Sequence, residues 1–336
     1  MFGPGGVRKM SRRTARKPRI FWPRRRRAHC LFAVAPPHAA MSPREFHLNP
    51  ADYGLPTREQ FVALRIWDTH FHGFWNAPQD PIAQYRFNDF YTERMGIERS
   101  ISLEIGGTLG DPLTPAPYDA ALRAILEAEK HRLSGITPID PGFPDESCAK
   151  MSNWIKDGPC IGIKYVGGNK RGLVCSHPNN DPIIRLAAEL DATIYIHTWL
   201  KVGGTPRLPG RDNNPGESTP MDVVALAKRF PNVRFICGHS GGDWELGIRA
   251  VRAQKNVLLE FAGSDPHSGA VDLAVKELGA DRVVWGGHGP SRSYATELGK
   301  VLDADLSHAD RMKILGGNFR RLAAPIFHRK GIKLEL

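Results

Sequence analysis

Two histidines at the end of a short apolar run are the residues best suited to chemistry in this sequence. His70 and His72 stand two positions apart in residues 65–75, which read RIWDTHFHGFW. Side chains alternate along a β-strand, so both imidazoles would leave the same face, roughly 6.5–7 Å apart. Imidazole is a ligand for Zn²⁺, Mn²⁺ and Fe²⁺. The pair alone fits a metal site and an exposed strand with two titrating histidines equally well.

The elements that would position these histidines alternate along the chain from residue 60 onward. We expect strands at residues 65–70, 100–105, 134–139, 160–166, 193–197, 233–237, 256–261 and 282–285. Helical spacing is clearest at 118–131 and recurs at 182–190, 221–230, 244–253, 270–278 and 310–322. Alternating strands and helices indicate an α/β fold with parallel βα units. Eight strands in about 250 residues favour a (β/α)₈ TIM barrel, with an open doubly wound sheet as the alternative.

Five of the thirteen histidines fall at the carboxyl ends of four expected strands. They are His70 and His72 on the first, His197 on the fifth, His239 after the sixth and His288 after the eighth. In a barrel these ends converge on one mouth, which is where the active sites of the fold lie. Scattered core or surface histidines would seldom align in this way, so the sequence predicts one histidine-rich active site.

The basic balance of the chain comes from its first forty residues. Eleven of the 46 Lys and Arg residues lie in 1–40, which contain no acid, and the remaining 35 match the 35 Asp and Glu. The balanced remainder argues against a nucleic-acid partner. We expect residues 1–40 to be a disordered basic tail and 41–336 to be a single barrel domain. A targeting signal, or an upstream extension of a frame that starts at Met41, are the alternatives for the tail.

The cysteines and the hydropathy indicate the compartment. The five cysteines are odd in number and show no CxxC spacing, as expected of reduced thiols in a cytoplasmic protein. No apolar run approaches the length of about 18 residues that a membrane span needs, so we expect no membrane association.

Residues 65–325 resemble the amidohydrolase-related family of the metal-dependent amidohydrolase superfamily. The segments that carry the resemblance are IWDTHFH at 66–72, GIKYV at 162–166, IHTW at 196–199, CGHSGGD at 237–243 and ILGGNFRRL at 314–322. The resemblance implies that His70, His72 and His197 bind a divalent metal, with zinc favoured over manganese and iron. It also implies that His239 orients or protonates the reacting group.

The eighth strand departs from the family pattern, which is Gly-Ser-Asp followed by an apolar residue and Pro. Residues 286–290 read Gly-Gly-His-Gly-Pro, so His288 stands where the family has its metal-binding, proton-transferring aspartate. A neutral imidazole can take either role but brings no negative charge. Asp265 is either a replacement carboxylate or a helix N-cap. Glu104 is a further candidate for an acid in the mouth, and Asp68 is expected to point away from the two strand histidines and to have a supporting or structural role.

Five other residues are candidates for binding substrate. Lys164 ends the fourth strand and would lie beside a substrate carboxylate, or else extend from the barrel rim. Trp199, like Trp75, would wall an unsaturated substrate or only pack there. Arg207 and Arg211 belong to the Gly- and Pro-rich loop 201–220, which is a candidate lid, and would bind a carboxylate or be solvated.

The function that these features favour is metal-dependent hydrolysis. A metal held by His70, His72 and His197 together with His288 would activate a water. This water would attack a lactone, amide or similar carbonyl of a small organic acid, and His239 with His288 or Asp265 would handle the proton. Non-oxidative decarboxylation of an unsaturated or aromatic acid is the alternative at the same site. A barrel that has lost the acid and only binds its ligand is the alternative outside enzymes. The partner expected is a small-molecule carboxylate, and a homodimer is compatible with this fold.

Overall fold

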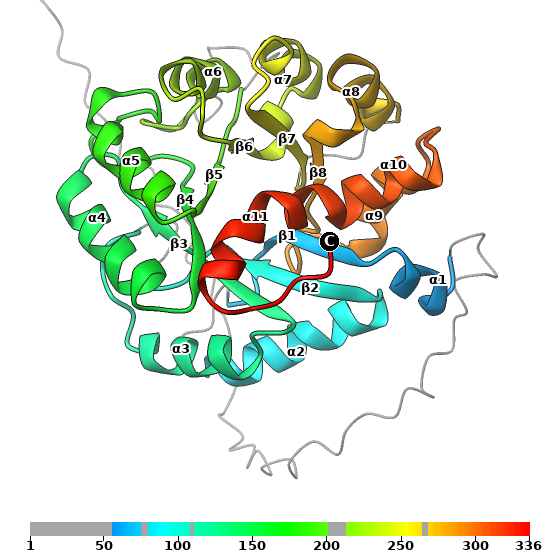
Figure 1. The fold of residues 1–336 in the computed structure, drawn as a ribbon, viewed down its shortest axis with the longest axis horizontal. Coiled ribbons are helices and arrows are strands. Elements are labelled where there is room, and N and C mark those ends of the chain that lie inside the picture. The colour runs from blue at the N-terminus through cyan, green and yellow to red at the C-terminus, as the bar shows by residue number, and fades with distance from the viewer. Residues whose placement is uncertain (1–55, 75–79, 108–110, 201–212, 264–267) are drawn as a thin grey trace, which may run out of the picture. The chain divides into compact units, whose positions relative to one another are not determined.

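The computed structural model describes residues 56–74, 80–107, 111–200, 213–263 and 268–336 (Figure 1). Eight parallel strands form one sheet in chain order. They are β1 (Ile66–Phe71), β2 (Ile97–Ser102), β3 (Leu133–Ile139), β4 (Cys160–Tyr165), β5 (Thr193–Ile196), β6 (Phe235–Cys237), β7 (Val257–Phe261) and β8 (Val283–Trp285). The basic tail expected at residues 1–40 lies outside the described residues.

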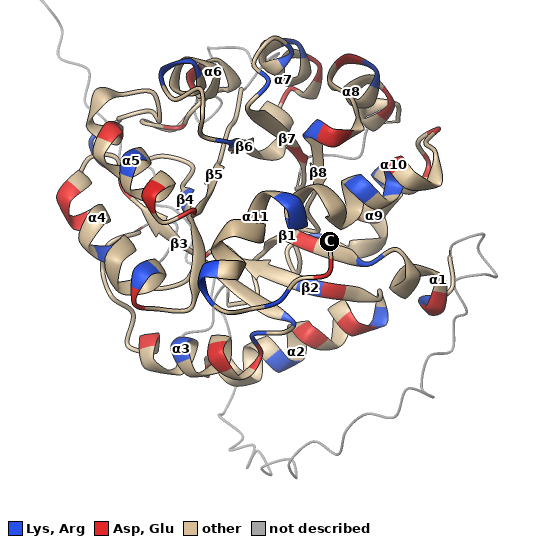
Figure 2. Cartoon of the chain, viewed as in Figure 1, with Lys and Arg blue, Asp and Glu red and all other residues tan. Residues whose placement is uncertain are grey.

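Helices surround the strands in the arrangement of a barrel (Figure 1). They are α1 (Arg58–Ala63), α2 (Pro81–Arg94), α3 (Asp119–Ala128), α4 (Pro144–Met151), α5 (Asp181–Glu189), α6 (Pro220–Arg229), α7 (Trp244–Val251), α8 (Ala270–Leu278), α9 (Tyr294–Leu302), α10 (His308–Met312) and α11 (Asn318–Arg329). The predicted (β/α)₈ barrel is confirmed. Acidic and basic residues are interspersed along these outer helices (Figure 2).

The seam between β1 and β8 is held by hydrogen bonds from outside the regular strand ladder. Thr69 Oγ1 donates to the Trp285 carbonyl at 2.7 Å. The Gly287 N–H donates to Asp68 Oδ1 at 2.6 Å, and the His72 N–H donates to the Gly289 carbonyl at 2.7 Å. These bonds bring the eighth strand's loop against the first strand, so the histidines of both meet at one end of the barrel.

The C-terminal segment closes the opposite end. A π-helical turn, Lys313–Gly317, separates α10 from α11. Arg320 Nη1 donates to the Arg65 carbonyl at 2.6 Å, and Asn318 Nδ2 donates to the Val283 carbonyl at 2.6 Å. A Cβ on Gly316 would lie 2.6 Å from the Arg65 carbonyl oxygen, so only glycine lets the turn approach β1 this closely. The prediction of a single helix at 310–322 is wrong in its bounds, because the π-helical turn divides this segment and α11 continues to Arg329.

The strands are buried on both faces, as their continuous apolar runs predict. The prediction of β2 at 100–105 is wrong by three residues, which leaves Glu104 in the loop beyond the strand. Helices α2, α4 and α9 were not predicted. In α2 the reason is that Asn88 and Thr92 face inward while Phe87 and Tyr91 are exposed, so the apolar residues do not mark the buried face.

The described cysteines, Cys148, Cys160, Cys175 and Cys237, are free thiols. Among the helices within the described ranges, none is long and apolar enough to cross a membrane.

Candidate metal centre

His70 and His72 converge at the carboxyl end of β1, both almost fully buried. Their Nε2 atoms lie 3.0 Å apart. Two nitrogens that each bind one zinc ion at about 2.0–2.1 Å can be at most about 4.2 Å apart, so this spacing suits a shared ion. The predicted projection of both imidazoles toward one point is confirmed.

A buried glutamate stands behind each of these two imidazoles. His70 Nδ1 lies 3.1 Å from Glu260 Oε1, and His72 Nδ1 lies 2.6 Å from Glu104 Oε1. Histidines that bind a metal usually donate their second N–H to such a partner, which fixes the tautomer. With both Nδ1 atoms protonated, two Nε2 lone pairs face each other at 3.0 Å. That arrangement is repulsive by itself and is relieved by a cation, so the residues fit a metal.

His197, at the end of β5, follows the same pattern. Its Nε2 lies 3.0 Å from Glu217 Oε1, which leaves Nδ1 as the nitrogen able to face an ion. The ring packs edge-on against His239 at a centroid distance of 4.6 Å. Two groups of described residues bring atoms that could bind a metal within 4.8 Å of one another. One group is His70, His72 and His288, and the other is His70, His239 and Glu260. His197 borders these clusters without belonging to either.

The two remaining histidines have neutral partners. His288 stacks on His70 with ring centroids 4.3 Å apart and planes inclined by 23°, and its Nδ1 contacts the Ser291 hydroxyl. His239 Nδ1 lies 2.8 Å from the Ala262 carbonyl oxygen, to which it donates. Both residues have φ near +50°, a left-handed conformation that turns the loops after β6 and β8 inward. Among the described residues, the structure thus places a glutamate beside His70, His72 and His197, and a carbonyl or hydroxyl oxygen beside His239 and His288.

Burial lowers the pKa of all five imidazoles below its ordinary value, and the charge of Lys164 adds to the effect. For His288 the pKa falls to about 2. The neutral imidazole is the form that binds a metal or accepts a proton. The histidine cluster is therefore in the state that its expected chemistry needs.

Three functional residues were not anticipated from sequence: Glu260, Tyr195 and Glu217. Burial raises the pKa of Glu260 to about 8, against the opposing effect of hydrogen bonds from the His239 N–H and the Tyr195 hydroxyl. Glu260 is the lone acid in the apolar strand VLLEF, and Tyr195 precedes His197 by two positions and shares its strand face. These two signals were available. The sequence contains no such signal for Glu217, because nothing in the loop before α6 indicates which polar side chain faces the site.

Lys164 ends β4 with only 1% of its side chain exposed. Its Nζ lies 5.2 Å from the centre of the Tyr195 ring. Burial lowers the pKa of Lys164 to about 8, while Glu104 and Glu260 oppose that shift. Trp199 stacks beside His197, with centroids 6.4 Å apart and planes inclined by 21°. Lys164 and Trp199 therefore lie at the mouth. Glu104, by contrast, contacts His72.

Asp68 lies two positions before His70 in β1, so strand alternation places it on the same face as the two histidines, and the expectation that it points away from them is wrong. Its Oδ1 accepts from the backbone N–H of Gly287 and His70, and its Oδ2 accepts from the Tyr294 hydroxyl at 2.8 Å. Burial raises the pKa of Asp68 to about 6. The residue ties β1 to the β8 loop.

Four candidates named from sequence lie outside the described residues: Asp265, Arg207, Arg211 and Trp75. The N-cap of α8 is Gly269, so the interpretation of Asp265 as that cap is wrong.

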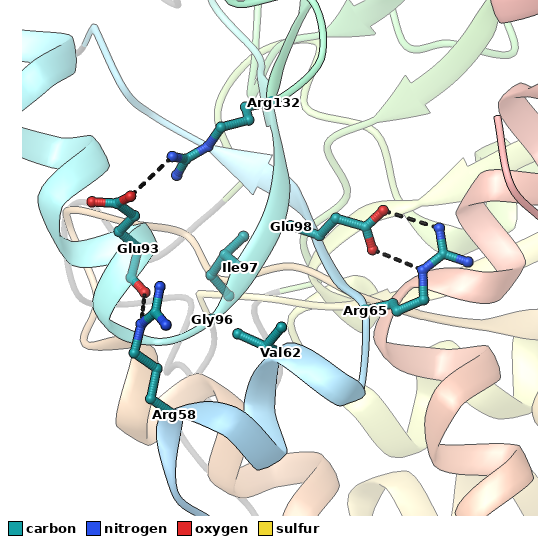
Figure 3. A pocket seen from close by; sticks show the side chains of 8 residues that line it. All are labelled: Arg58, Val62, Arg65, Glu93, Gly96, Ile97, Glu98 and Arg132. Carbon is teal, nitrogen blue, oxygen red and sulfur yellow. Dashed lines mark hydrogen bonds and ion pairs between the residues drawn. The ribbon is translucent and has the colours of Figure 1, made fainter. Parts of the chain in front are cut away.

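A separate cavity of about 370 Å³ lies where β1 and β2 begin (Figure 3). Its three arginines already have partners: Arg65 pairs with Glu98 at 3.0 Å, Arg132 with Glu93 at 3.2 Å, and Arg58 Nε donates to the Glu93 carbonyl at 3.2 Å. Active sites of this fold lie at the opposite, carboxyl ends of the strands. The histidine cluster, not this cavity, is the candidate active site.

The family model described as amidohydrolase matches residues 67–322, which include all five mouth histidines. The chain belongs to the amidohydrolase family, as the sequence motifs predicted. The family and the histidine cluster together support a divalent metal as the cofactor. No curated protein matches the chain at the level of sequence.

Solved structures with the same fold include several decarboxylases. A 2,6-dihydroxybenzoate decarboxylase complexed with 2,6-dihydroxybenzoate has a TM-score of 0.60 and 17% identity, covering 77% of this chain and 98% of that one. The 5-carboxyvanillate decarboxylase of Sphingomonas paucimobilis has a TM-score of 0.57 and 15% identity, covering 78% and 99%. A dihydroxybenzoic acid decarboxylase of Polaromonas, with bound manganese and the inhibitor 2-nitroresorcinol, has a TM-score of 0.57 and 18% identity, covering 77% and 96%. At these identities the likeness shows the fold.

Proposed function

We propose that the protein is a metal-dependent hydrolase that acts on a lactone, amide or similar carbonyl of a small organic acid. The observation that carries the proposal is the division of the five histidines. Three are backed by buried glutamates, which suits metal ligands, and two are backed by neutral groups, which suits proton transfer.

In this proposal His70, His72 and His197 hold the metal. A divalent cation there supplies Lewis acidity, which polarises a carbonyl and makes water more acidic. Zinc is our first choice because nitrogen-rich sites suit it, and manganese, which is bound in the Polaromonas decarboxylase, is the second.

His239 and His288 move the proton. Each imidazole has a ring nitrogen lone pair, which in this proposal accepts a proton from the attacking water and returns it to the leaving group. Lys164 offers a buried positive charge to the carboxylate of the substrate. Trp199 flanks the mouth beside His197 and would limit how the substrate lies.

Decarboxylation of an aromatic or unsaturated acid is the second candidate. Its support is the shared fold with three aromatic-acid decarboxylases, together with the buried Lys164 charge. Decarboxylation needs a donor to protonate the carbon that loses carbon dioxide. His288 stands in place of the acid of the family pattern, so we place the proton-accepting role, and hence hydrolysis, first for this chain.

The test is metal analysis followed by substrate assay on protein purified without chelator. We expect about one bound metal per chain, lost in His70→Ala. Carboxylated lactones and hydroxylated aromatic acids are then assayed in parallel, with acid release and carbon dioxide release as separate readouts. Carbon dioxide release alone would establish the second candidate. A protein that binds metal and these acids but turns over none of them would be a binding protein, and the hydrolase proposal would be withdrawn.

A further inference from the structure

We infer that Glu260 is a positioning residue that supplies the metal centre with the negative charge missing from its eighth strand. The inference rests on the proposed metal centre and deepens it. It concerns the departure at His288, where an imidazole stands in place of the acid of the family pattern.

The contacts of Glu260 reach both classes of histidine. Its Oε1 lies 3.1 Å from His70 Nδ1, and its Oε2 accepts from the His239 N–H at 2.8 Å. The Tyr195 hydroxyl donates to the same Oε2 at 2.9 Å and lies 2.7 Å from His70 Nδ1. Glu260 is fully buried, so the protein alone determines these contacts. One carboxylate thus orients a metal ligand and the backbone of a proton-transferring residue.

The eighth strand leaves room for this carboxylate. A Cβ on Gly286 would lie 2.3 Å from Glu260 Oε1 and 2.5 Å from His70 Cβ. In the sheet register Glu260 pairs with Val284, two residues before that glycine. The segment that carries His288 in place of an acid therefore also admits an acid from the neighbouring strand.

Burial alone favours the neutral form of Glu260, but a bound divalent cation favours its carboxylate, and the formal charges of the buried site then balance. Three glutamates, Glu104, Glu217 and Glu260, stand behind the three expected ligands. They offset a divalent cation together with the ammonium of Lys164. Glu260 contacts two of the mouth histidines through hydrogen bonds, His70 and His239. It also lies on the strand beside β8.

An amide cannot replace this carboxylate. If the NH₂ of a glutamine took the place of Oε2, it would face the backbone N–H of His239, which can only donate a hydrogen bond. Placed at Oε1, it would face His70 Nδ1 and favour the tautomer with its proton on Nε2, the nitrogen that points at His72. Glu260→Gln therefore disturbs metal binding in either orientation, although its shape is unchanged.

The experiment is a double-mutant cycle on metal affinity. Metal-stripped protein is titrated with Zn²⁺, and separately with Mn²⁺, against a competing chelator. We expect Glu260→Gln to weaken binding by about 10- to 100-fold, the usual effect of losing such a partner. Tyr195→Phe, which keeps the carboxylate, is the matched control and should lose much less. His288→Asp should change affinity little in the wild type and restore most of the loss in the Glu260→Gln background.

Each outcome bears on a different claim. If His288→Asp improves affinity equally in both backgrounds, or if Glu260→Gln binds metal like the wild type, the role of Glu260 is refuted while the metal centre stands. If the wild type binds neither metal, both proposals fall. Should Glu260→Gln not fold, Glu260→Asp, which keeps the charge but shortens the side chain, is run through the same cycle. Because Glu260→Asp keeps the charge, we expect it to lose less affinity than Glu260→Gln would and to be rescued correspondingly less by His288→Asp; a full 10- to 100-fold loss would contradict the role of the charge.

Discussion

Replacing Asp68 by asparagine should change how stability depends on pH. The carboxylate is fully buried and accepts hydrogen bonds from Gly287, His70 and Tyr294. Asparagine keeps the shape, its carbonyl oxygen can accept both backbone bonds, and the Tyr294 hydroxyl can turn to accept from its NH₂. The main difference between the two proteins is therefore the buried charge.

The magnitude follows from the pKa. Burial raises the pKa of Asp68 from 3.8 to about 6. Below the lower value the carboxyl is neutral in both the folded and the unfolded chain. As the pH rises toward about 6 the unfolded chain loses its proton first, so the wild type loses stability over this window. At about 1.4 kcal/mol per pKa unit, the loss amounts to about 3 kcal/mol.

The assay compares urea unfolding of the wild type and Asp68→Asn between about pH 4 and pH 7, both with chelator, followed by tryptophan fluorescence. The difference in the free energy of unfolding should move by up to about 3 kcal/mol in favour of asparagine as the pH rises. Asp145→Asn, at an exposed acid of α4, controls for the amide substitution itself. A difference that stays constant with pH, or moves in favour of the wild type, would refute the reasoning.

Three further changes test the rest of the site. Glu217→Gln removes the carboxylate behind the fifth-strand histidine and should weaken metal affinity by about 10- to 100-fold in a chelator competition; unchanged affinity would exclude that histidine as a supported ligand. Lys164→Met should lower kcat/KM for a carboxylate substrate by about 10- to 150-fold, the value of a hydrogen bond to a charged group, and leave an uncharged ester analogue unaffected. Equal losses on both substrates would contradict carboxylate binding. Gly286→Ala places a Cβ 2.3 Å from the Glu260 carboxylate and should lower the free energy of unfolding by about 1–3 kcal/mol. Gly299→Ala in α9, where an added Cβ would meet nothing within 4 Å, is the control. Thermal melts of the two variants should show that Gly286→Ala destabilises the protein and Gly299→Ala does not.

Local pattern was sufficient for the barrel and for the set of mouth histidines. Apolar runs alternating with helical spacing predicted each strand within three residues, because burial on both faces leaves the strand runs uninterrupted. His70, His72, His197, His239 and His288 were found from their places at strand ends alone, since parallel strands bring those ends to one mouth. The shared direction of His70 and His72 followed from the period of two along a strand, which also places Asp68 on their face and not on the opposite one.

The partners of those histidines were decided only by the tertiary structure. Glu260 meets His70 from a position 190 residues away in the chain, and Glu104 meets His72 from 32 residues away in a loop that was predicted as strand. Sequence spacing contains no information about which buried carboxylate comes to lie behind which imidazole, because that contact depends on the register of non-adjacent strands and on how each loop returns. The sequence by itself therefore identified the histidines that meet at the mouth, and the fold decided which carboxylate lies behind His70, His72 and His197.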